Sequence, residues 1–210
     1  MRRIVACVWW VGVLSALAVV PVSADTIVIG GCSGCFGLTY TLTVDPGSGG
    51  TYKASLNISG TYEGNPHAQY ISAVNFKVAS DVASPTLTGA PGGVAGWQTF
   101  ESNINNAGCA GSGNGFVCSQ DPATVSLAPL KAGGGYVPIN DTWSWTFVPA
   151  GEIFPGLLGA HIGAKFNNAA GDLNGLIVSE TYYPVPEPAT LVLVGGALVF
   201  VGARLRRVRK

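Results

Sequence analysis

The sequence predicts an all-β domain, an antiparallel β-sandwich of the immunoglobulin-like or jelly-roll-like kind, placed between two membrane-directed ends. Apolar and polar residues alternate in several short runs, with the period of a strand that has one buried face. The 210 residues include 30 glycines and 13 prolines, and many of them lie between these runs, where turns are needed. Outside the two ends, no window of the sequence shows the period of an amphipathic helix.

The expected strands follow one another along the middle of the chain. The first two, over 38–44 and 52–58, are separated by the turn-forming run 45–50, which predicts a hairpin. Seven or eight short strands with turns between them are typical of a sandwich, and the sequence has no fixed repeat that would indicate a solenoid. The remaining candidates are 71–78, 124–127, 143–148, 161–166 and 176–183.

The N-terminal end reads as a secretory signal peptide over residues 1–24. Two arginines at positions 2 and 3 precede an apolar run over 4–20, and Val22-Ser23-Ala24 forms a small-residue cleavage site. We therefore expect signal peptidase to cut between Ala24 and Asp25. The alternative is an uncleaved membrane anchor, against which the small residues of the cleavage site argue.

The charge of the exported part differs from that of the whole chain. The chain has 11 basic and 11 acidic residues. Most of the basic residues lie in the two ends, so residues 25–184 keep four lysines against ten carboxylates, a net charge of −6. This balance argues against a nucleic-acid partner, which needs a basic surface. It fits an extracellular protein kept apart from its neighbours by like charge.

Four cysteines remain once the signal peptide is removed: Cys32, Cys35, Cys109 and Cys118. An even number in an oxidising compartment predicts two disulfides. The pairs Cys32–Cys35 and Cys109–Cys118 are favoured because each encloses a small glycine-containing loop, while the crossed pairings stay open. A thioredoxin-like redox motif would need a helix after Cys35, where the sequence predicts a strand. A zinc site of four thiolates has an irregular spacing and belongs to another compartment.

Three aromatic residues, Trp143, Trp145 and Phe147, alternate along one expected strand and so share one face. If the face is buried, the row is half of a sandwich core; if it is exposed, the rings could stack on sugars. The apolar residues that follow, with no cluster of polar neighbours, favour the core. Trp97, flanked by small and polar residues, is a further candidate for sugar stacking.

The sequence shows no pattern of catalytic or metal-binding residues. His67 and His161 are isolated, and no Gly-x-Ser-x-Gly, His-Glu-x-x-His or phosphate-binding loop is present. The acidic residues do not have the spacing of an EF-hand or of a calcium-binding nonapeptide repeat. We therefore expect no catalytic residue, no metal and no cofactor; a single loop Ca²⁺ near Asp45 or Asp141 is the alternative that stays open.

The C-terminal end has three parts. Val185-Pro186-Glu187-Pro188 stays extended, because each proline fixes φ and removes an amide donor. The apolar run 189–203 can enter a bilayer as a helix, but it is shorter than the roughly 20 residues of a lasting transmembrane helix. A basic tail then holds the far end in the cytoplasm; its charged residues are Arg204, Arg206, Arg207, Arg209 and Lys210.

This end resembles the PEP-CTERM sorting signal of Gram-negative bacteria. The resemblance implies that an exosortase, a membrane protease-transpeptidase, recognises Pro186-Glu187-Pro188. It also implies a transient stay in the inner membrane, followed by delivery to the cell surface or extracellular matrix together with exopolysaccharide.

Together these features predict a signal peptide (1–24), an exported domain (25–184) and a sorting signal (185–210). The favoured function is that of a non-enzymatic surface or matrix protein. A carbohydrate-binding module that uses exposed Trp97, Trp143 and Trp145 is the alternative. A secreted hydrolase with an unrecognised site is less favoured.

We predict that the mature chain begins at Asp25, because the small-residue site at 22–24 follows an apolar core of the right length. N-terminal sequencing of the exported protein checks this. A chain that still begins at Met1, or that begins inside the first strand, would contradict the prediction.

Overall fold

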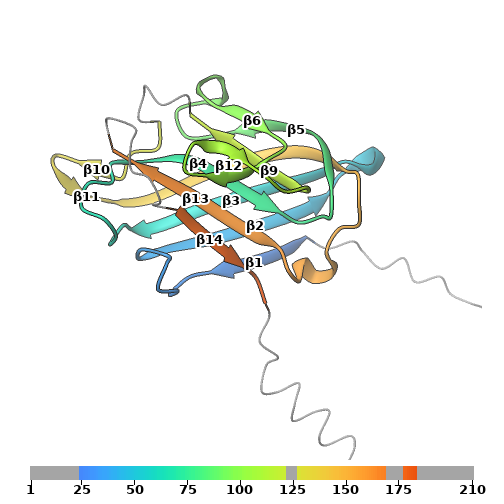
Figure 1. Cartoon of the computed structure of the whole chain (residues 1–210), viewed down its shortest axis with the longest axis horizontal. Helices are drawn as coiled ribbons and strands as arrows, with labels where there is room; N and C mark the ends of the chain where they lie inside the picture. Colours follow the sequence, from blue (N-terminus) through green and yellow to red (C-terminus); the bar gives the residue numbers. More distant parts are fainter. Residues whose placement is uncertain (1–23, 122–126, 169–176, 184–210) are drawn as a thin grey trace, which may run out of the picture.

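Two five-stranded antiparallel sheets pack face to face in the computed structural model, which describes residues 24–121, 127–168 and 177–183 (Figure 1). A buried apolar cluster between the sheets draws side chains from both of them. Each sheet is amphipathic along its strands, so the sandwich buries both apolar faces at once. The predicted all-β antiparallel sandwich is confirmed.

The first sheet has the strand order β1-β2-β3-β12-β5. The hairpin of β2 and β3 pairs Leu42 with Leu56, and its turn contains Gly49 and Gly50, both with positive φ, which favours glycine. The longest strand, β12, lies in the middle and pairs with β3 and β5. The bounds are β1 Asp25–Ile29, β2 Leu38–Pro46, β3 Tyr52–Thr61, β12 Pro138–Pro149 and β5 Val82–Gly89.

The second sheet has the strand order β14-β13-β4-β9-β6. Its bounds are β14 Ile177–Thr181, β13 His161–Asn167, β4 Tyr70–Lys77, β9 Phe116–Gln120 and β6 Gln98–Phe100. Two small hairpins accompany the sheets: β7 Asn103–Asn105 with β8 Gly108–Gly111, and β10 Lys131–Ala132 with β11 Gly135–Tyr136. The helical elements among the described residues are single 3₁₀ turns: η1 Ser48–Gly50, η2 Val94–Gly96 and η3 Pro155–Leu157.

The aromatic row of β12 forms the centre of the core. Trp143, Trp145 and Phe147 are at most 1% exposed. Phe76 of β4 packs against this row from the opposite sheet, with its ring centroid 5.0 Å from that of Trp145 and 5.7 Å from that of Phe147. The Trp145 indole also donates a hydrogen bond to Ser119 Oγ at 2.8 Å, which joins β12 to β9 across the core. The two sheets are therefore joined by apolar packing and by a buried polar contact.

Most of the predicted strands are present, and several observed strands were not predicted. The runs 38–44, 52–58, 71–78, 143–148 and 161–166 correspond to β2, β3, β4, β12 and β13. Within the predicted strand 176–183, residues 177–181 form β14. The predicted strand 124–127 lies almost entirely outside the described residues. The strands β1, β5, β6 and β9 and the short hairpins were missed. In β5 only Val82 is buried, so its sequence carries no alternating apolar signal.

Replacing Trp145 with alanine should lower the free energy of unfolding by about 3–5 kcal/mol, because it opens a cavity between the sheets and removes the bond to Ser119. Urea unfolding of the processed protein measures this. Ser144→Ala, on the outer face of the same strand, is the matched control and should change the value by less than about 0.5 kcal/mol. Equal losses in the two variants would contradict the packing described.

Candidate functional site

The residues of the sorting signal, Val185 to Pro188 and the basic tail, lie outside the described residues. The chain that leads to them is held firmly. The backbone N–H of Tyr182 donates to the Ala160 carbonyl at 2.8 Å, and Gly159 donates to the Tyr182 carbonyl at 2.9 Å. Three residues lie between Tyr182 and Pro186, so the four Cα–Cα steps span at most about 14 Å. The sorting motif is therefore tethered directly to the sandwich.

The proposed signal-cleavage site also adjoins the fold. Asp25 is the first residue of β1 and lies opposite Val44 of β2, while Ala24 precedes the strand. Within 24–121, 127–168 and 177–183, the structure holds no helix long and apolar enough to cross a membrane.

Both disulfides form with the favoured pairing. Cys32–Cys35 closes a tight turn between β1 and β2, with 5.1 Å between the Cα atoms. Cys109–Cys118 ties the small β7–β8 hairpin to β9, with 5.7 Å between the Cα atoms. All four sulfurs are used in these two bonds, so none remains for the crossed pairings or for a four-thiolate zinc site.

The tryptophan row lies in the core and not on the surface. Trp143 and Trp145 are fully buried, and Trp97 is 7% exposed. The Trp97 ring packs edge-on against Trp143 at 5.5 Å between centroids, and its N–H donates to the Pro91 carbonyl. The hypothesis that these three residues stack on sugars is therefore wrong, because their faces are covered by protein.

The outer face of the first sheet is neutral and polar. Hydroxyl and amide side chains face outward in adjacent registers on three neighbouring strands: Thr39, Thr41 and Thr43 on β2; Ser55, Asn57 and Ser59 on β3; and Asn140, Thr142, Ser144 and Thr146 on β12. Asn57 Nδ2 donates to Asn140 Oδ1 at 2.8 Å and to Thr142 Oγ1 at 2.9 Å. We call this surface the hydroxyl face. It is the outward half of the alternation that predicted the strands.

Part of the hydroxyl face is hollowed. A depression of about 430 Å³ lies over the ends of the strands, where Asp45 and Lys53 face each other across β2 and β3. Ser55, Thr88 and Ser144 line it as well. Hydroxyl side chains therefore line the hollow, with one charge of each sign at its edge, but most of its exposed surface is apolar.

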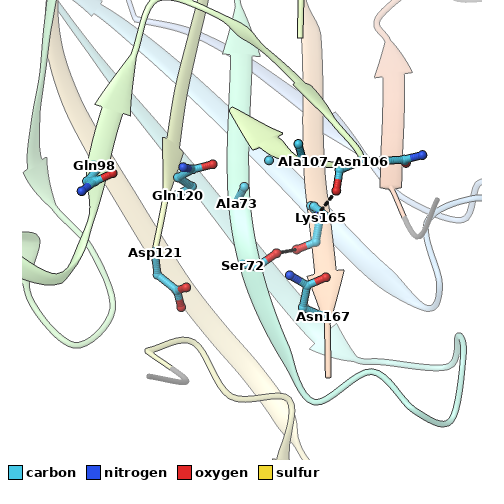
Figure 2. A pocket seen from close by; sticks show the side chains of 10 residues that line it. Ser72, Ala73, Gln98, Asn106, Ala107, Gln120, Asp121, Lys165 and Asn167 are labelled. Carbon is cyan, nitrogen blue, oxygen red and sulfur yellow. Dashed lines mark hydrogen bonds between the residues drawn. The ribbon is translucent and has the colours of Figure 1, made fainter. Parts of the chain in front are cut away.

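A second cavity, of about 370 Å³, opens on the outer side of the second sheet (Figure 2). Its floor is β4, its two sides are β13 and β9 with β6, and the loop between β7 and β8 forms a further wall. We call it the Lys165 cavity. Its lining residues are Ser72, Ala73, Gln98, Asn106, Ala107, Gly108, Gln120, Asp121, Lys165 and Asn167.

Several polar side chains of the Lys165 cavity are buried although they belong to the outer face of a sheet. Lys165 is 5% exposed, Asn167 4% and Ser72 5%. Lys165 Nζ donates to the Asn106 carbonyl at 2.5 Å, and Ser72 Oγ donates to the Lys165 carbonyl at 3.2 Å (Figure 2). Burial lowers the pKa of Lys165, because the ammonium loses hydration there.

Sequence reasoning missed this cavity. Strand β13 is buried on both faces, with His161 alone of its residues only partly covered. A lysine in such a strand, in a domain with only four lysines, was the available signal. The lysine alone could not predict a cavity, because the cavity is closed by the β7–β8 hairpin, which covers the outer face and was itself not predicted.

Neither histidine, His67 or His161, lines the Lys165 cavity. His161 lies beside Phe116, and its ring nitrogens are within 3.2 Å of Thr181 Oγ1 and Ser179 Oγ. Burial, and then the nearby charge of Lys77, lower the pKa of His161. The described residues contain no group of three or more His, Cys, Asp or Glu side chains placed to hold a metal ion.

The fold and its bonds define a disulfide-linked antiparallel β-sandwich domain. Residues 184–207 match the PEP-CTERM protein-sorting motif. The match confirms the resemblance seen in the sequence, and the motif indicates an exported protein of Gram-negative bacteria that is sorted by an exosortase.

Two further comparisons bear on the exported domain. No curated protein matches the chain. Among solved structures, the chain is similar to an uncharacterized protein from Nocardia farcinica with an immunoglobulin-like fold, at 11% identity and a TM-score of 0.33. The match covers 69% of this chain and 85% of that protein.

Removing the Cys109–Cys118 bond by a double serine substitution should lower the free energy of unfolding by about 2–3 kcal/mol through loop-closure entropy. The matched control removes Cys32–Cys35, which closes a shorter loop (separation 3 against 9) and should cost about 1.5 kcal/mol. Chemical unfolding of both variants, with thiol counting on the wild type, checks this. Reactive thiols in the denatured, unreduced wild type would contradict the pairing.

Proposed function

We propose that this chain is a non-enzymatic cell-surface or extracellular-matrix protein whose sandwich domain associates with exopolysaccharide. The observation that carries the proposal is the sorting motif at 184–207. In this scheme signal peptidase removes residues 1–24, the apolar run holds the precursor in the inner membrane for a time, and exosortase then cuts at the Pro186-Glu187-Pro188 motif. No nucleic acid takes part.

The hydroxyl face supports the second half of the proposal. Its threonine, serine and asparagine side chains offer both donors and acceptors, and its one lysine faces an aspartate. Such a surface can exchange hydrogen bonds with a hydrated, hydroxyl-rich polymer, each worth about 0.5–1.5 kcal/mol. Many weak contacts of this kind suit retention in a matrix better than tight binding of one ligand.

The two alternatives have less support. A carbohydrate-binding module that works through Trp97, Trp143 and Trp145 requires accessible rings, and these rings are buried. A glycoside hydrolase uses a pair of carboxyl groups across the scissile bond. Asp121 is the one carboxylate among the described residues that line the Lys165 cavity, so a hydrolase is the weaker alternative.

Replacing Pro186-Glu187-Pro188 with three alanines should leave export intact and block release, because the extended, charged segment that exosortase reads is lost. The uncut precursor should then accumulate in the inner membrane. Cell fractionation with intact-mass measurement reads both the location and the C-terminus.

Glu152→Ala is the control, since it removes an exposed carboxylate without touching the tail, and it should be processed as in the wild type. If the triple-alanine protein reached the surface or the medium with its C-terminus trimmed as usual, the motif would not be the sorting signal.

A further inference from the structure

The Lys165 ammonium is a buried cation with no anionic partner among the described residues. Its contact is the Asn106 carbonyl, which takes up one of its three donor positions. Buried charges in proteins are normally paired, because an isolated one loses most of its hydration. Lys165 lines an open cavity, so an anionic group entering that cavity can supply the missing partner.

The cavity also presents a buried acceptor to the same space. Asn167, two residues further along β13, is 4% exposed, and its Oδ1 has no hydrogen-bond partner among the described residues. Figure 2 shows the Asn167 amide and the Asp121 carboxylate on either side of Ser72. A hydroxyl group of a ligand is a donor that can satisfy Asn167 Oδ1, while the amide of Gln98 at the rim offers donors and acceptors.

The wall of the cavity is held in place before any ligand arrives. The Cys109–Cys118 bond fixes the β7–β8 hairpin to β9. Gln120 Oε1 accepts from the Cys109 N–H at 2.6 Å, and Ser102 Oγ donates to the Cys109 carbonyl at 2.8 Å. A site that is already formed loses less entropy when it binds. At about 370 Å³, the cavity is near the lower end of the usual size range of small-molecule sites, about 300–1,000 Å³.

We propose that the Lys165 cavity binds a small hydroxylated carboxylate, a sugar acid, with its carboxylate on Lys165 Nζ and its hydroxyl groups toward Asn167. The sugar acid can be a free molecule or a uronate unit of a polysaccharide. The proposal goes beyond the sorting role and does not depend on it, because it rests on the geometry of the cavity alone.

Titration calorimetry on the processed, exported protein tests this with three probes: D-glucuronate, D-glucose and a short oligoglucuronate. Glucose differs from glucuronate only in carrying a neutral hydroxymethyl group in place of the carboxylate. Glucuronate should bind at least tenfold more tightly than glucose. Equal affinity for the free acid and the oligomer identifies the free acid as sufficient, and binding of the oligomer alone identifies the polymer as the source.

Lys165→Met keeps the alkyl stem and removes the charge, so it should abolish the preference for glucuronate over glucose. Lys131→Met is the matched control, because Lys131 also donates to a backbone carbonyl, that of Pro66, at 2.6 Å but lies outside the cavity. It should bind as the wild type does.

If Lys165→Met fails to fold, Gln98→Ala at the exposed rim serves instead and should weaken glucuronate binding several-fold. The proposal is overturned if neither acidic probe binds, if glucose binds as well as glucuronate, or if a folded Lys165→Met protein keeps the preference. The sorting experiment reads location and cleavage, so either proposal can fail without the other.

Discussion

The interlock between the aromatic row of β12 and the opposite sheet is the contact on which the rest of the structure depends. β12 pairs with a strand on each side, and its inward row meets Phe76 and Ser119 of the second sheet. Because side chains alternate along a strand, burying this row turns Thr142, Ser144 and Thr146 to solvent. The packed core and the neutral hydroxyl face are therefore two consequences of one register.

The second sheet uses its outer face differently. There the β7–β8 hairpin lies over β4, β9 and β13 and buries polar side chains that would otherwise be in solvent. The Cys109–Cys118 bond and Gln120 hold this hairpin. The disulfide therefore stabilises the fold and also positions a wall of the cavity. Lys165 also contacts this hairpin, because its ammonium donates to the carbonyl of Asn106 in the loop between β7 and β8. Stability and a potential binding site thus share the same bonds.

The two ends of the sandwich limit how the chain can be processed. Asp25 already belongs to β1, and Tyr182 is held by Ala160 and Gly159. With at most about 14 Å of chain between Tyr182 and Pro186, the exosortase works against the folded domain unless the last strand detaches. β14 pairs with β13 alone in its sheet, and an edge strand opens more readily than a central one.

The sequence by itself determined the features that depend on local pattern. These are the C-terminal sorting motif and the strands with strict alternation such as β2 and β12. The signal peptide remains a prediction from the sequence, and the disulfide pairing, which the sequence left open, was decided by the structure. Only the tertiary structure decided which face of each strand was buried and what covered it, because alternation gives two faces without saying which neighbours they meet. That is why Trp97 could be taken for a surface residue and why the Lys165 cavity went unseen. Its walls come from β4, β9 and β13 and from a hairpin without apolar alternation, and these segments, far apart in the sequence, meet only through the sheet order and the Cys109–Cys118 bond.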